Sequence, residues 1–169
     1  TSAGTAFFLE EYSTAGLVGT ITVPTTGTNR LVMAGSSTSE GFLSLSSDFS
    51  KLSIPGYDAA LALAGVASAA NIARSVGTFG LGYGSFNKIN STLTTGSNLR
   101  SVASEGNNYW GANASGGISY LGTGTSGNVY STIGNTRVVS AQNGSLFFST
   151  GSTTLGVHKI GSGLPTTTG

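Results

Sequence analysis

The sequence has no cysteine, three prolines and a single histidine. Without cysteine the chain can form neither a disulfide nor a thiolate metal site. One histidine cannot build a histidine-based metal cluster within a chain. His158 alternates with its neighbours, so we interpret it as a solvent-facing strand residue. We therefore predict no metal site and no cofactor.

Charged residues are also scarce, at 8% of the chain against a usual share of roughly 25%. The net charge is +1, and the seven basic residues are scattered rather than clustered. Because a nucleic-acid interface needs grouped lysines and arginines, we predict no nucleic-acid partner. No apolar run approaches the roughly 20 residues of a transmembrane helix, so we also predict no membrane span.

What the chain has in abundance is glycine, at 27 residues, together with serine, threonine and asparagine. Apolar residues make up 38% and recur throughout, whereas a disordered chain has few apolar residues and many charges. We therefore predict a folded chain, and a single domain over residues 1–169 because no shift in composition divides it. Low charge, small polar residues and no cysteine are typical of bacterial exported surface proteins, which predicts a secreted or cell-surface location.

Short apolar runs, several of them alternating at period two, predict an all-β fold. Turn residues separate these runs, and helix signals are nearly missing. We interpret the alanine-rich segment 59–70 as a long loop with room for a helical turn, because Gly65 interrupts it. The predicted strands are 6–12, 17–23, 41–46, 51–54, 72–77, 85–90, 98–102, 117–122, 128–133, 135–139 and 156–161, with a short extra strand allowed at 31–34.

Part of the chain repeats. Residues 98–102 (NLRSV) match residues 135–139 (NTRVV) at an offset of 37, and residues 117–122 match residues 156–161 at an offset of 39. Repeats of about 40 residues with four strands each are typical of β-propeller blades. We predict propeller-like units at about 1–28 (partial), 29–97, 98–134 and 135–169 (partial), which together form an incomplete ring. A β-sandwich or a β-solenoid is the alternative.

Three segments carry a resemblance to a known family. They are FLEEY at residues 8–12, SEGFLSLSSD continuing to IPGYD at 39–58, and NTRVV continuing to GSGLPT at 135–166. These segments resemble large secreted bacterial proteins with β-propeller-like blades, many of which carry a C-terminal surface-sorting tail. The resemblance implies export and a blade architecture, and it implies no activity. In that family the repeats continue past this last segment, which supports an incomplete ring here.

Four residues are candidate ligand contacts. Tyr57 and Asp58 stand beside the alanine-rich segment, where we expect a loop surface. Tyr109 and Asn113 combine an aromatic face with an amide, which suits sugar binding. The repeat alignment matches Trp110 with another aromatic residue, so we assign Trp110 to the core and expect Tyr109 to point the other way.

Other polar residues have structural interpretations. The six carboxylates include no pair with a recognisable catalytic motif, and Asp48 and Glu105 stand at predicted hairpin turns. We therefore predict no catalytic residue. Three Asn-x-Ser/Thr sequons make Asn90, Asn113 and Asn143 candidate glycosylation sites.

Four arginines, Arg30, Arg74, Arg100 and Arg137, each lie at or near a predicted strand start. Their recurrence predicts a structural role, such as donating hydrogen bonds to backbone carbonyls. The alternative is a ring of arginines that lines a channel and binds an anion.

We predict an extracellular structural or interaction module for surface adhesion, matrix or filament assembly. Incomplete blades expose edges that can pair, so the expected partners are further copies in a homo-oligomer, or a second chain that completes the ring. The alternative function is a lectin-like carbohydrate-binding propeller with a glycan as partner. A glycan-active enzyme ranks last, and we predict that the chain is not an enzyme.

Overall fold

A computed structural model describes residues 2–82, 86–93, 96–122, 126–152 and 154–168. This part of the chain contains fifteen β-strands and no helix, so the predicted all-β class is confirmed. Within the same residues there is consequently no helix with the length and hydropathy to cross a membrane.

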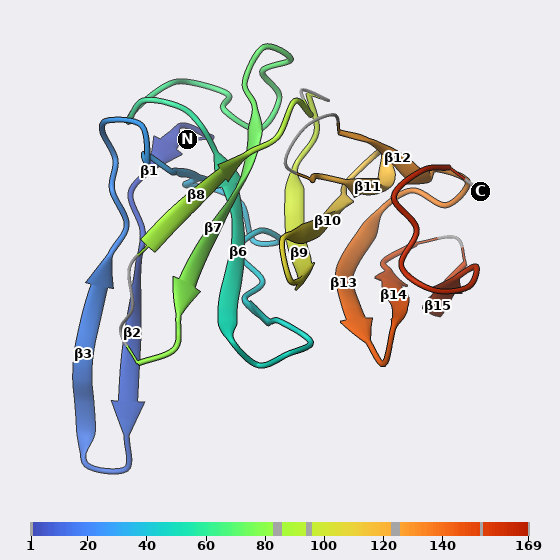
Figure 1. Cartoon of the computed structure of the whole chain (residues 1–169). Coiled ribbons are helices and arrows are strands. Elements are labelled where there is room, and N and C mark those ends of the chain that lie inside the picture. The colour runs from blue at the N-terminus through green and yellow to red at the C-terminus, as the bar shows by residue number, and fades with distance from the viewer. Residues whose placement is uncertain (1, 83–85, 94–95, 123–125, 153, 169) are drawn as a thin grey trace.

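The first elements are a short strand pair and a long hairpin. Strands β1 (Gly4–Thr5) and β4 (Met33–Ala34) pair with each other, and β2 (Phe8–Ser13) and β3 (Gly16–Thr22) form the antiparallel hairpin. Figure 1 shows that this hairpin extends beyond the rest of the molecule at one end. Alternation places Leu9 and Ile21 on its inner side and Phe8 and Glu10 on its outer side.

The first four-stranded sheet contains β5 (Ser44–Leu45), β6 (Lys51–Tyr57), β7 (Arg74–Gly80) and β8 (Phe86–Asn90), in that order. The prediction that the strand at 51–54 ends before Pro55 is wrong, because Pro55 pairs with Val76 inside β6. Strand β5 pairs only with Leu52 and Ser53. The missing N–H of Pro55 therefore removes no hydrogen bond from the β5 side of the ladder.

The next two sheets are simple antiparallel meanders. The second sheet contains β9 (Leu99–Glu105), β10 (Asn108–Asn113), β11 (Gly117–Tyr120) and β12 (Gly127–Tyr130), and the third contains β13 (Thr136–Gln142), β14 (Ser145–Thr150) and β15 (Gly156–Ile160). Asn143 and Gly144 both have positive φ, at 47° and 65°, which is the geometry of a type I′ turn. An Asn-Gly pair adopts this turn readily, so it fixes the β13–β14 hairpin.

The hairpin and the three sheets stand side by side in chain order (Figure 1). Apolar clusters join the neighbours: Leu9, Ile21 and Phe79 between the hairpin and the first sheet, Val76, Val102 and Tyr109 between the first and second sheets, and Trp110, Leu146 and Phe148 between the second and third. The described strands close neither a barrel nor a ring, so the propeller-like arrangement stays a prediction.

The alanine-rich segment is a loop of turns, as predicted, and the buried side chain of Arg74 holds it. The Arg74 guanidinium donates to the carbonyl oxygens of Ala69 at 2.9 Å, Ile72 at 2.6 Å and Ser97 at 3.0 Å, and to that of Ala67. This confirms the predicted carbonyl-bonding role for that arginine.

Most predicted strands differ from the observed ones in their bounds, usually by one to three residues at an end. The strand predicted at 85–90 is present as β8 from Phe86, and Ser85 lies outside the described residues. The strand predicted at 128–133 ends at Tyr130, because only residues as far as Tyr130 pair with β11.

Candidate functional site

Tyr57 lies at the end of β6 with its side chain fully buried. Its hydroxyl donates to Oε1 of Glu40 at 2.7 Å, and the Arg74 guanidinium lies 5.3 Å from the ring centroid. Burial, and then the negative charge of Glu40, raise the pKa of the Tyr57 hydroxyl well above its usual range. The tyrosine predicted as a ligand contact is thus a member of an internal polar network.

Glu40 is the centre of that network, and the sequence reasoning did not select it. Besides Tyr57, its Oε1 accepts a hydrogen bond from Nδ2 of Asn98, and its Oε2 accepts one from the backbone N–H of Ala34 at 3.2 Å. One carboxylate therefore joins β4, the end of β6 and the residue before β9. No local pattern marks this role, because Tyr57 and Asn98 are 17 and 58 residues away in the chain.

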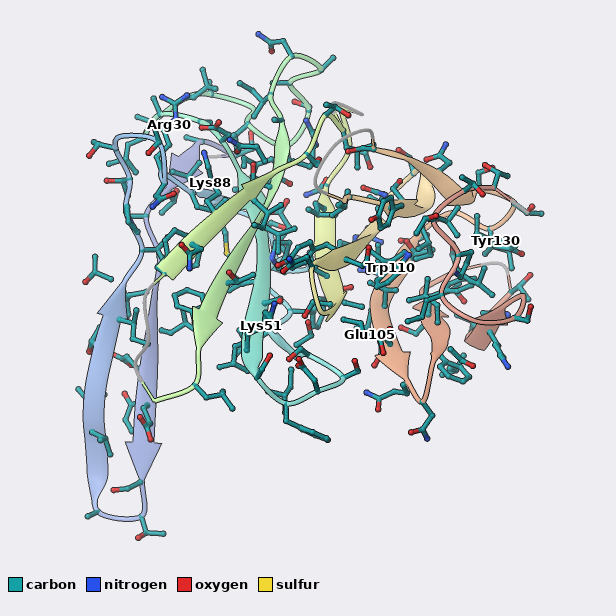
Figure 2. All side chains as sticks on the ribbon, viewed as in Figure 1. Arg30, Lys51, Lys88, Glu105, Trp110 and Tyr130 are labelled. Atoms are coloured by element: carbon teal, nitrogen blue, oxygen red, sulfur yellow. The ribbon has the colours of Figure 1, made fainter. Side chains whose placement is uncertain are left out.

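Asp58 is held by two cations. Its Oδ1 lies 2.7 Å from Nε of Arg30, and its Oδ2 lies 3.0 Å from Nζ of Lys88. Figure 2 shows Arg30 and Lys88 on the same side of the molecule. Burial raises the pKa of the Asp58 carboxyl, but the hydrogen bonds and charges of Arg30 and Lys88 outweigh that effect, so the pKa lies below its ordinary value. This pairing gives Asp58 a structural role at the junction of two strands and a loop.

Tyr109 and Asn113 lie in β10 of the second sheet and are both buried. Tyr109 packs with Val102 and Leu121, and burial raises the pKa of its hydroxyl. Trp110 is also buried, as predicted, and its Nε1 donates to the carbonyl oxygen of Pro165 at 2.7 Å. Tyr109 points to the opposite side of the sheet from Trp110, as expected, but it is not accessible there, because a neighbouring sheet covers that side as well.

The structure also places the three sequon asparagines. Asn113 is fully buried and donates from Nδ2 to Oγ of Ser119 at 3.0 Å, so attachment of a glycan would require β10 to open. Asn90 and Asn143 are exposed, at the end of β8 and in the β13–β14 turn. Glycosylation at these sites stays a prediction, as does a ligand-binding role for Tyr57, Asp58, Tyr109 and Asn113.

The third sheet has one covered face and one open face. We call the open one the terminal face; it consists of Val138, Ser140, Phe147, Ser149, Val157 and Lys159. Val157 is 76% exposed, and it lines a hollow of about 270 Å³ together with Val138 and Phe147. His158 points to the covered side and stacks on Phe148 with ring centroids 5.1 Å apart, so it is partly buried rather than solvent-facing as predicted.

The second sheet shows what covers the same face one repeat earlier. In the second sheet Trp110 of β10 lies opposite Tyr120 of β11, and in the third sheet Phe147 of β14 lies opposite Lys159 of β15. Trp110 and Phe147 therefore occupy equivalent positions on the same side of their sheets. The residues of the second sheet on that side pack under the third sheet; they are Ala103, Trp110, Ala112, Ile118 and Tyr120. The terminal face is therefore a sheet-packing position on which no described residue of the chain packs a further sheet.

The outer side of the hairpin is the other exposed sheet surface. We call it the hairpin face; it consists of Phe8, Glu10, Tyr12, Val18, Thr20 and Thr22. Phe8 is 59% exposed and Val18 54% exposed. The hydroxyl of Tyr12 donates to Oε2 of Glu10 at 2.8 Å, so the carboxylate stays on the outer side.

Within the described residues, no group of three or more His, Asp or Glu side chains comes together as a metal site. Comparison with protein-family models, with curated proteins and with solved structures finds no match to this chain. The resemblance to secreted bacterial repeat proteins stays a prediction.

Proposed function

We propose that this chain is an extracellular structural module that assembles with other protein chains through its terminal face. The observation that supports this is the exposure of Val138 and Val157 beside a half-buried Phe147, at positions whose counterparts in the second sheet are buried under the third sheet. Covering apolar surface is favourable by roughly 25 cal/mol per Å², so a face of this kind favours a partner. The extracellular location rests on composition, with little charge and many small polar residues.

A propeller-like arrangement is part of the proposal. The blades of a propeller are small antiparallel sheets that pack face to face in chain order. The sheets of this chain are small and antiparallel, and they follow one another in the same way. Closed propellers have at least about four blades, and this row contains one hairpin and three sheets. Sheets from other chains would continue the row beyond the terminal face.

The test is the mass of the purified chain in solution, measured by sedimentation velocity over a concentration series. Val157→Asp places a charge in the terminal face, whereas Leu61→Asp places one at an exposed apolar residue of the alanine-rich loop, which belongs to neither face. We expect the wild type and Leu61→Asp to associate as concentration rises, and Val157→Asp to stay monomeric. A wild type that is monomeric at every concentration contradicts the proposed function.

The lectin-like alternative gains no support from the site. Tyr57, Tyr109 and Asn113 are buried, and Asp58 is occupied by Arg30 and Lys88. Stacking on a sugar needs an accessible aromatic face beside free hydrogen-bonding groups, and these four residues do not provide one together.

A further inference from the structure

We infer that the partner on the terminal face is the hairpin face of a second copy of this chain, in a head-to-tail contact. This inference rests on the proposed function and identifies its partner. It follows from the direction in which the sheets pack, from the charge of the two faces and from their positions in the molecule.

The internal contacts have a direction. The second sheet packs the Trp110 side of its strands on the third sheet, and the terminal face is the same side of the third sheet. At the other end, the inner side of the hairpin packs through Leu9 and Ile21 on the first sheet. The hairpin face is then the side on which a preceding sheet of the row would pack. In a second copy that precedes this one in the row, the terminal face is the surface that would contact the hairpin face.

The two faces are complementary in charge. Residues 1–29 contain Glu10 and Glu11 and no lysine or arginine, whereas residues 106–169 contain Arg137 and Lys159 and no aspartate or glutamate. Glu10 lies among Phe8 and Val18 on the hairpin face, and Lys159 lies among apolar residues on the terminal face. Opposite charges at the edge of an apolar contact favour this pairing, whereas pairing of like faces would bring like charges together.

The two faces lie at opposite ends of the row of sheets (Figure 1). The hairpin of one molecule therefore does not reach its own β15, and the contact has to form between copies. Because the two contacting surfaces are different, this association is heterologous, and each face can be inactivated separately.

The experiment uses one variant for each face. Phe8→Asp inactivates the hairpin face and leaves the terminal face intact, and Val157→Asp does the reverse; both residues are exposed, so the monomer should fold. Burying an unpaired charge in a contact should weaken self-association of either variant at least about a hundredfold. Val18→Asp is the second variant of the hairpin face, and circular dichroism checks the fold of all three.

The decisive sample is an equimolar mixture of Phe8→Asp and Val157→Asp. Each chain alone should be monomeric, and the mixture should form a heterodimer and nothing larger, since only one pair of intact faces is present. If the wild type associates but variants of the hairpin face associate equally well, or the mixture stays monomeric, the head-to-tail contact is wrong while assembly stands. If the wild type does not associate at all, the proposed function fails as well.

A charge exchange gives an independent measurement. Glu10→Lys or Lys159→Glu alone should weaken the association about two- to fivefold, the size expected for an exposed ion pair. The chain that carries both substitutions should recover wild-type affinity, because opposite charges face each other again. Equal affinities in all four chains would show that these two residues do not meet, and would overturn the pairing of these two faces.

Discussion

At the scale of single residues, Asp58 combines a depressed pKa with a buried partner. The side chain of Lys88 is only 1% exposed, so Asp58→Asn would leave its ammonium group without a counter-charge. We expect the variant to lose about 1.5–3 kcal/mol of unfolding free energy at neutral pH, the usual value of a hydrogen bond to a charged group. Urea denaturation measures this loss, with Glu105→Gln at the end of β9 as the control.

The same substitution has a defined pH dependence. The folded state holds the pKa of Asp58 below its ordinary value of 3.8, so the unfolded chain takes up a proton first as the pH falls. The stabilisation from Asp58 is therefore complete above that ordinary value and is lost as the pH falls through the folded-state pKa. The difference between wild type and Asp58→Asn should narrow in this acidic window, and a difference that stays constant would contradict the ion pair.

What the sequence predicts about single residues depends on whether their partners are local. The sequence predicts a turn at Asp48, and the Asp48 carboxylate accepts a hydrogen bond from the backbone N–H of Ser50, two residues away, at 3.1 Å. Nothing in the sequence marks Glu40, because its partners Tyr57 and Asn98 are 17 and 58 residues away in the chain. Hydrogen bonds between residues far apart in the chain depend on how the strands pack, so no characteristic spacing in the sequence predicts them.

At the scale of elements, β10 is packed closely on both sides. A Cβ at Gly111 would lie 2.6 Å from Cδ1 of Leu99 and 2.8 Å from Cδ1 of Leu121, whereas a Cβ at Gly127 in β12 would have no atom within 4 Å. We expect Gly111→Ala to lower the unfolding free energy by about 1–3 kcal/mol, as overpacking does. Gly127→Ala is the matched control, with an expected change within about 0.5 kcal/mol. Equal urea midpoints for both variants would contradict the close packing.

The positions of the strands were largely predictable, and their burial was not. Alternating residues and turn pairs such as Asn143-Gly144 depend on local geometry, so they mark the strands and hairpins. Period-two alternation, however, assumes one covered and one open face. In the second sheet the neighbouring sheets cover both sides, which is why Tyr109 and Trp110 are buried although they point in opposite directions.

At the scale of the whole molecule, a head-to-tail contact leaves one free face at each end of every open assembly. Growth should therefore continue past the dimer, either to a ring of fixed size or to an open series. The repeats in the sequence predict the individual sheets. The direction in which the sheets pack, and the opposite charges of the hairpin face and the terminal face, become visible only in the folded chain. A symmetric contact between identical faces would instead stop at the dimer.

Capping of the assembly by one variant distinguishes the head-to-tail contact from a symmetric contact between identical faces. The Phe8→Asp chain keeps its terminal face and can bind the exposed hairpin of a growing assembly, but it presents no hairpin face for the next copy. Adding it to the wild type should lower the mean mass in proportion to the amount added, as measured by light scattering at constant total concentration. Leu61→Asp carries the same charge in the alanine-rich loop, outside both faces, so it should join the assembly without shortening it. A mean mass that responds equally to both chains would mean that the hairpin does not carry the contact.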